Sequence, residues 1–195
     1  YLNSGVVTAS AAGAHYYGLD GQQLAEEVRS LENPVLTASR TTAVAYDAGN
    51  QTLSAFRSGE KYFQLTLEGN ADLLSARPNE GGWLAVTAQQ SGYKGAVTVY
   101  DRKGEEIIQI SLSSVFVVDA AVSPDGQTVA VVTIGQAGGS FFSRLLLYRV
   151  NQKEPFAQVD LGSITVLDMD FDEGVVWLVG EDRLVTVSLL PDGET

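Results

Sequence analysis

The stretch that decides the fold is Ser123-Pro124-Asp125-Gly126-Gln127-Thr128-Val129-Ala130-Val131, a tight turn followed by an apolar run. Proline fixes its own φ angle, aspartate accepts hydrogen bonds from the backbone just after it, and glycine adopts a positive φ without strain. The run from Thr128 is rich in β-branched residues, which favours an extended conformation. The sequence therefore predicts a strand that begins directly after a glycine turn.

The same order of turn and apolar run recurs along the chain. Degenerate copies of the turn lie at 78–81 and 172–174, and the glycines that end the three copies, Gly81, Gly126 and Gly174, are 45 and 48 residues apart. A second polar turn, which ends in Gln or Glu, falls between these copies. Its final residues are Gln22, Glu60, Glu105, Glu154 and Glu194. Two markers that keep the same phase indicate a structural repeat of about 40 to 50 residues.

A repeat of this length, made of four short apolar segments, is typical of one four-stranded blade of a β-propeller. We therefore predict an all-β protein, a β-propeller segment of about four blades of four antiparallel strands. In the fullest copy the expected strands are 117–122, 128–133, 143–150 and 155–161. The predicted blades are 1–33 (partial), 34–70, 71–114, 115–162 and 163–195 (partial).

One segment, Gln22–Glu32, leaves two alternatives open. Leu24, Val28 and Leu31 have the spacing of one face of a helix. The repeat requires a fourth strand in the same place. We prefer the strand, because the markers on either side keep their phase.

The two ends of the chain predict an incomplete ring. Residues 5–10 and 14–19 fit second and third strands, and the chain stops after a third strand and its turn. The ends therefore duplicate rather than complement each other. We expect either a piece of a seven- or eight-bladed protein, or two copies that self-associate through their open blade edges.

The turn and strand at Ser123–Val131 resemble the recurring signature of bacterial β-propellers of the TolB and WD40-like type. The Trp-Asp pair and the Gly-His pair of WD40 repeats are missing, and Tyr100-Asp101 stands once in the place of the former. These departures argue against a eukaryotic WD40 scaffold. The degenerate repeats are similar to those of an uncharacterised bacterial cell-surface family. The resemblance implies an extracytoplasmic location, with a membrane anchor in the full-length protein.

Composition excludes several classes of partner and chemistry. Lys and Arg number 12 against 24 Asp and Glu, which gives a formal net charge of −12. Neither nucleic acid nor an anionic membrane surface is an expected partner for such a chain. Cysteine is absent, so thiol catalysis, disulfides and Cys-ligated zinc are excluded within this segment. His15 is the only histidine and no nucleophile-elbow pattern occurs, so we expect no catalytic residues and no cofactor.

The string Asp168-Met169-Asp170-Phe171-Asp172-Glu173-Gly174 is the most suggestive for binding. Carboxylates two residues apart on a strand point the same way, and oxygen clusters suit Ca²⁺. The match to an EF-hand loop fails at two of its positions, however, where Glu173 and Val179 stand. The repeat makes the string a first strand and turn. Because first strands line the central channel, Asp168 and Asp170 are the predicted binding residues there.

Two enlarged connections between second and third strands are expected on one face. They are Gln89–Gly95 and Gly135–Ser140, and we predict that the latter is a long flexible link. It lacks the Lys-Ser/Thr pair of a phosphate-binding loop. Tyr93 and Phe142 are the candidate residues for contact with a partner on this face.

The sequence thus favours a non-enzymatic binding or scaffolding propeller of an extracytoplasmic bacterial protein. Its expected ligand is a protein or a glycan, bound through the loops and the channel mouth. The alternative is an enzyme or a metal-dependent sensor whose site is completed by blades outside this chain.

Overall fold

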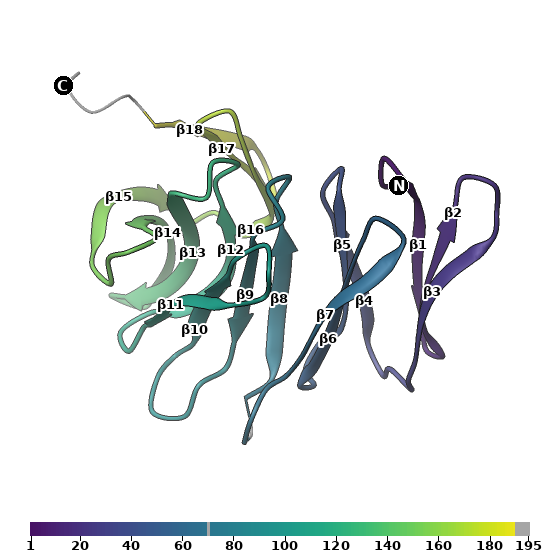
Figure 1. Cartoon of the computed structure of the whole chain (residues 1–195). Helices are drawn as coiled ribbons and strands as arrows, with labels where there is room; N and C mark the ends of the chain where they lie inside the picture. Colours follow the sequence, from purple (N-terminus) through teal and green to yellow (C-terminus); the bar gives the residue numbers. More distant parts are fainter. Residues whose placement is uncertain (70, 190–195) are drawn as a thin grey trace.

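The computed structural model describes residues 1–69 and 71–189 (Figure 1). Within this part, 18 strands form five antiparallel sheets that follow one another along the chain, which confirms the all-β prediction. The first sheet contains β1 (Gly5–Ser10), β2 (Gly13–Gly18) and β3 (Gln23–Val28). The second contains β4 (Pro34–Ala38), β5 (Thr42–Asp47), β6 (Thr52–Arg57) and β7 (Glu60–Thr66).

The third sheet contains β8 (Leu73–Pro78), β9 (Leu84–Ala88), β10 (Ala96–Tyr100) and β11 (Glu106–Ser111). The fourth contains β12 (Phe116–Val122), β13 (Thr128–Ala137), β14 (Ser140–Arg149) and β15 (Pro155–Gly162). The fifth contains β16 (Val166–Asp172), β17 (Val175–Gly180) and β18 (Leu184–Ser188). The marker turn that ends at Glu194 lies outside the described residues.

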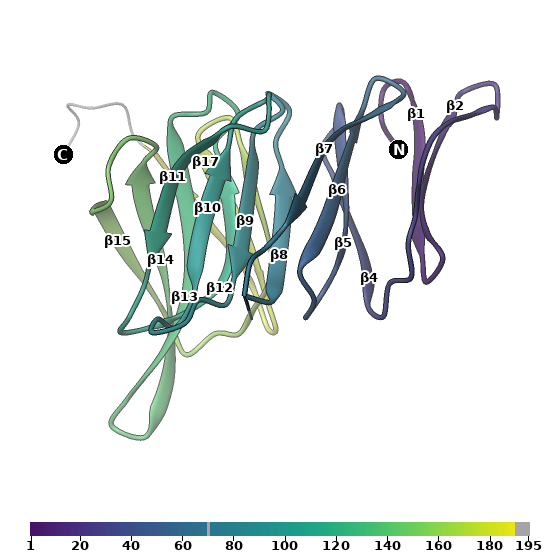
Figure 2. The same cartoon turned by 60° about the horizontal axis from the view of Figure 1, so that its bottom comes forward.

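The sheets stack face to face in an arc (Figures 1 and 2). Four hydrophobic clusters fill the spaces between successive sheets. In chain order they include Tyr16 with Phe56, Leu53 with Leu84, Val97 with Val129, and Leu145 with Leu178. Burial of apolar flanks between neighbouring sheets is therefore the main force that holds the blades together.

The second strands show the effect of this stacking. Every residue of β5 and β9 is buried, as are the first six residues of β13. Exposure alternates along β17 instead, because only one face of the fifth sheet is covered within the described residues. Strands covered on both faces read as continuous apolar runs, which explains the pattern in the sequence.

Repeated register shifts reveal which blade position each strand occupies. The pairs β2–β3, β6–β7, β10–β11 and β14–β15 all contain a bulge beside an aromatic residue, at Tyr17, Phe56, Tyr100 and Tyr148. The pairs β8–β9, β12–β13 and β16–β17 share a different bulge near the start of the first strand. The first sheet therefore holds the second, third and fourth strands of a blade, and the fifth sheet holds the first, second and third.

The segment with two alternatives is a strand. β3 pairs with β2, and the bulge sets Leu24 apart from the paired residues. A methyl group of Leu24 lies against Gly59 in the next sheet, whereas Leu31 is buried beyond the end of the strand. The helical spacing of the apolar residues is therefore coincidental, since they serve different contacts.

The turn that decides the fold has the predicted geometry. The Gly126 N–H donates to the Ser123 carbonyl at 2.9 Å, and the Thr128 N–H donates to the Ser123 hydroxyl at 2.9 Å. Gly126 has φ 72°. A Cβ there would lie 2.5 Å from the ring of Trp83 in the preceding sheet. Glycine is thus required both by the backbone angle and by close packing between blades.

The prediction of a flexible link at Gly135–Ser140 is wrong. β13 and β14 remain paired as far as Ala137 and Ser140, so that only Gly138 and Gly139 lie between them. Both glycines have positive φ, 59° and 84°, as a two-residue hairpin turn requires. The segment is the tip of a long hairpin, because the paired glycines close the turn locally and free the flanking residues to pair.

Candidate functional site

A hollow of about 720 Å³ opens on the inner side of the arc. Its walls are the carboxyl ends of β4, β8 and β12, the length of β16 from Asp168, and Tyr1. We call this space the channel hollow. It lies where the first strands of several blades converge.

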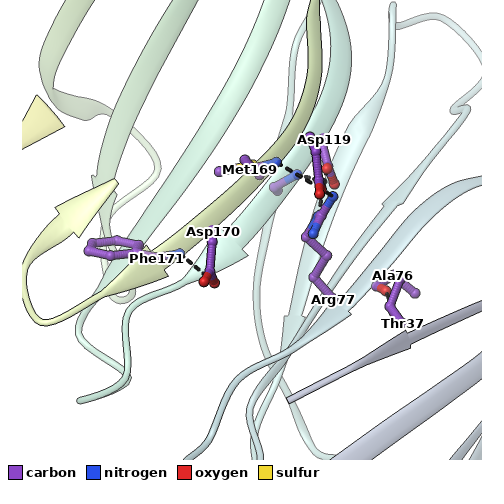
Figure 3. Close-up of polar contacts among 9 residues, drawn as sticks. Thr37, Ala76, Arg77, Asp119, Met169, Asp170 and Phe171 are labelled. Carbon is purple, nitrogen blue, oxygen red and sulfur yellow. Dashed lines mark hydrogen bonds and ion pairs between the residues drawn. The ribbon is translucent and has the colours of Figure 1, made fainter. Parts of the chain in front are cut away.

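One guanidinium joins three sheets beside the channel hollow. Arg77 on β8 donates from Nε to Oδ2 of Asp119 on β12 at 2.6 Å, and from Nη2 to Oδ1 of Asp168 on β16. Figure 3 shows Arg77 reaching from its strand towards Asp119. The Arg77 and Asp119 side chains are mostly buried, whereas the Asp168 side chain is 63% exposed. The strands of three blades are therefore linked by ionic hydrogen bonds.

The bulge of each first strand positions these carboxylates. Asp119 and Asp168 follow the bulge in their respective sheets, opposite Val132 and Val179. In each, Oδ1 accepts the backbone N–H of the next residue, Ala120 or Met169, at 2.9 Å. This local bond orients each carboxylate independently of its contact with Arg77.

The charges of this network affect neighbouring groups. Burial lowers the pKa of Arg77, but the charge of Asp119 and the hydrogen bonds to Asp119 and Asp168 outweigh it, so that the pKa is raised. Burial raises the pKa of Tyr46, and the charge of Asp119 raises it further while Arg77 partly offsets it. Both shifts follow from placing charges in a poorly solvated space.

A second link ties β4 to β8 nearby. The hydroxyl of Thr37 donates to the carbonyl of Ala76 (Figure 3). At the rim, Arg40 Nε lies 3.0 Å from Glu80 Oε1. The four strands β4, β8, β12 and β16 are thus fixed to one another by polar contacts as well as by packing.

The β16 side of the channel hollow is acidic. Asp168, Asp170 and Asp172 are all exposed on the same side of the strand. Asp170 Oδ1 accepts the Phe171 N–H at 2.9 Å (Figure 3). No described residue forms an ion pair with Asp170 or Asp172. Two carboxylates in this wall therefore retain uncompensated charge.

Neither a metal-binding cluster nor a membrane-spanning helix occurs among residues 1–69 and 71–189. No group of three or more His, Asp or Glu side chains in that part is placed to hold a metal ion. No helix in it has the length and apolar character needed to cross a membrane.

The predicted binding residues fall in three places. Asp168 and Asp170 line the channel hollow. Tyr93 lines a separate groove at the opposite end of the blades. Phe142 lies outside both; its ring crosses Gly135 on the paired strand, and the Arg144 guanidinium carbon lies 4.3 Å from the ring centroid. Of the two loop residues, only Tyr93 therefore lines a groove.

Sequence reasoning missed Arg77, which organises the channel wall. The register places Arg77 level with Ala121 and Asp170 in the next two sheets. When the first strands β8, β12 and β16 are aligned by their bulges, β8 has a cation, whereas β12 and β16 have carboxylates. This change from positive to negative charge between neighbouring first strands is the signal in the sequence that could have indicated an ionic contact of Arg77.

Comparison with solved structures defines the class of protein. The chain is similar to Hsv2 of Kluyvelomyces marxianus, with a TM-score of 0.67 and 12% identity over 100% of this chain and 59% of that one. It is also similar to the Cps50 (Swd1) β-propeller domain of Myceliophteria thermophila, with a TM-score of 0.60 and 13% identity over 98% and 67% of the two chains. Both are WD40 β-propellers. The predicted β-propeller fold is confirmed, with five sheets in place of about four blades.

The sequence itself defines the family. Residues 1–188 match the model of a family of unknown function, DUF5711, and the chain belongs to that family. No curated protein sequence matches the chain.

The same architecture also occurs in an enzyme. The hydrazine synthase of Kuenenia stuttgartiensis matches with a TM-score of 0.61 and 12% identity over 88% of this chain and 50% of that one. The chain spans about half to two thirds of the length of these solved structures. At such low identities the likeness defines the fold, and function must be argued from the site.

Proposed function

We propose that this chain is a non-enzymatic binding propeller, and that it takes a positively charged segment of a partner protein in the channel hollow. The observation that carries the proposal is the wall formed by β16. There Asp170 and Asp172 face an open space of about 720 Å³ without a cationic partner among the described residues. Propellers with WD40 architecture commonly mediate protein interactions, which supports the same class of function.

The rigid surroundings suit binding rather than a large rearrangement. Arg77 is held by two aspartates from different sheets, and Thr37 ties the adjacent strand. A preformed wall lowers the ordering cost of association. Exposed carboxylates at its edge increase the rate of encounter with a basic partner.

The proposal places the domain outside the cytoplasm of a bacterium, in a protein anchored to the cell surface. This location is supported by the resemblance of Ser123–Val131 to bacterial propellers of the TolB type.

The test is fluorescence anisotropy with a labelled peptide of alternating Lys and Gly, titrated at two salt concentrations. We expect binding that weakens at higher salt. The double variant Asp170→Asn, Asp172→Asn should weaken binding by about tenfold, equivalent to about 1.4 kcal/mol.

The matched control is Asp160→Asn, Asp182→Asn, which changes the net charge equally at exposed positions away from the channel hollow. It should leave the affinity nearly unchanged. An equal loss in both double variants would mean that only net charge attracts the peptide, and would contradict a site in the channel hollow.

A further inference from the structure

A second hollow of about 1140 Å³ lies between the second and third sheets. Its floor is one face of the third sheet, including Val86, Ala88, Ala96, Thr98 and Gln109. We call it the side groove. It lies at the end of the blades where β9 joins β10, because Ala88 pairs with both Leu73 at the start of β8 and Ala96 at the start of β10. The channel hollow lies at the other end.

The second and third sheets differ in their connections at this end of the blades. Residues 48–51 suffice to connect β5 to β6 in the second sheet, whereas residues 89–95 connect β9 to β10 in the third. No residue of β5 or β6 is among those that line the groove. Small side chains at the cross-strand pair Ala88 and Ala96 deepen it.

Two neutral amides, Gln109 and Gln90, line the groove, and each forms one side-chain hydrogen bond. Gln109 donates from Nε2 to Thr98 Oγ1 at 3.3 Å, and Ser111 Oγ donates to Gln90 Oε1 at 2.6 Å. No described residue forms a hydrogen bond with the side-chain oxygen Oε1 of Gln109 or with the side-chain amide NH2 of Gln90. Gln109 Oε1 is thus available as an acceptor, and Gln90 Nε2 as a donor, to a ligand in the groove. A hydroxyl group can use both, since it donates and accepts.

Two exposed aromatic rings flank these amides. Tyr93 is 48% exposed and Phe116 is 54% exposed, and both line the groove. Large exposed rings beside a few oriented polar groups are the usual composition of a small-ligand site. Pyranose rings combine an apolar C–H face with equatorial hydroxyls, and so match both features.

The charge near the groove argues against an anionic ligand. The ammonium of Lys94 lies 4.9 Å from the Phe116 ring centroid and donates to the Ser114 carbonyl at 3.2 Å. The carboxylate of Glu68 also lines the groove. Lys94, the one cation among the residues that line the groove, is therefore engaged by Phe116 and Ser114.

A peptide strand fits the floor less well. Strand addition uses the free backbone groups of a sheet edge, whereas β9 and β10, which supply most of the floor, are paired on both sides. Recognition here must come from side chains. We propose that the side groove binds a neutral saccharide, whose hydroxyls bond to Gln109 and Gln90 and whose ring stacks on Tyr93 or Phe116. This inference goes beyond the channel site and does not depend on it.

The test is an array of neutral and acidic oligosaccharides, probed with the whole chain and followed by calorimetry with the strongest neutral binder. A peptide array of neutral sequences runs in parallel. We expect binding confined to neutral oligosaccharides. Gln109→Ala and Phe116→Ala should each weaken it by about tenfold, as expected for loss of a central contact.

Ala88→Leu should abolish binding, because the added methyl groups fill the floor of an open groove. Phe141→Ala removes an equally exposed ring that does not line the groove, and should leave binding unchanged. Thermal unfolding shows whether Ala88→Leu is folded; if it is not, the exposed position Gln109 decides. Failure of every neutral oligosaccharide to bind, equal binding of acidic ones, or binding only on the peptide array would overturn the proposal.

Discussion

The fourth and fifth sheets are built to the same local plan but differ in what covers them. Each begins with a bulged strand that places an aspartate, Asp119 or Asp168, opposite a valine, Val132 or Val179. Val132 is 0% exposed and Val179 is 45% exposed. The local sequence sets the strands and the turn, whereas the neighbouring sheets decide which side chains are buried. Equivalent positions should therefore differ widely in their energetic importance.

The largest difference is expected for leucines in the two sheets. Leu145 is fully buried between the fourth and fifth sheets, whereas Leu184 is 60% exposed on the free face of the fifth. Leu145→Ala should lower the free energy of unfolding by about 3 kcal/mol through lost packing and a residual cavity. Leu184→Ala should change it by less than about 0.5 kcal/mol. Urea denaturation of both variants measures the difference, and similar losses would contradict the burial shown here.

The two glycine turns should show a smaller contrast. Gly126 and Gly174 have nearly the same positive φ, 72° and 77°. A Cβ at Gly126 meets the Trp83 ring, whereas one at Gly174 has only the Leu189 carbonyl oxygen, at 4.0 Å. Gly174→Ala should cost about 1 kcal/mol for the left-handed backbone, and Gly126→Ala about 1 kcal/mol more because the ring must move. Thermal unfolding of the two variants side by side tests this order.

The smallest expected effect appears at alkaline pH. Burial raises the pKa of Tyr148 in the fourth sheet to about 12, and the charge of Glu154 adds to it. Because the unfolded chain releases this proton near pH 10, the contribution of the neutral hydroxyl is complete below pH 10. It is lost as the pH rises through about 12.

At pH 11 the loss of stability should be about 1 kcal/mol. Tyr148→Phe should remove this part of the alkaline decline in denaturation experiments. The fifth sheet contains no tyrosine, so a variant there, such as Leu184→Ala, serves as the control. An alkaline decline that is unchanged in Tyr148→Phe would exclude a raised pKa at this residue.

The strands of the fourth sheet could be predicted closely because their signals are local. Turn residues such as Pro124 and Gly126 act within a few positions, and the continuous apolar run after them reports burial on both faces. The bulge between the third and fourth strands of a blade also has a local signal in the sequence, because an aromatic residue (Phe56, Tyr100 or Tyr148) lies beside it. These features depend on backbone angles and on neighbours in sequence.

The features that were missed depend on distant residues. Arg77 contacts carboxylates on two later first strands, and no local pattern reveals such partners. The link expected at Gly135–Ser140 is a hairpin because pairing continues to its tip. The side groove depends on a face of the third sheet that β5 and β6 do not line. Asp168 and Asp170 could be placed at the channel only because the repeat defined the first strands.

The most direct test of stacked blades around a common channel is a double-mutant cycle on the charges that join them. Arg77→Met, Asp119→Asn and the double variant should give a coupling free energy of about 2 kcal/mol, because this pair is mostly buried. The same cycle with Asp168→Asn should give less than about 1 kcal/mol, because that carboxylate is exposed to solvent. Coupling near zero in both cycles would contradict an arrangement in which one arginine bridges three sheets.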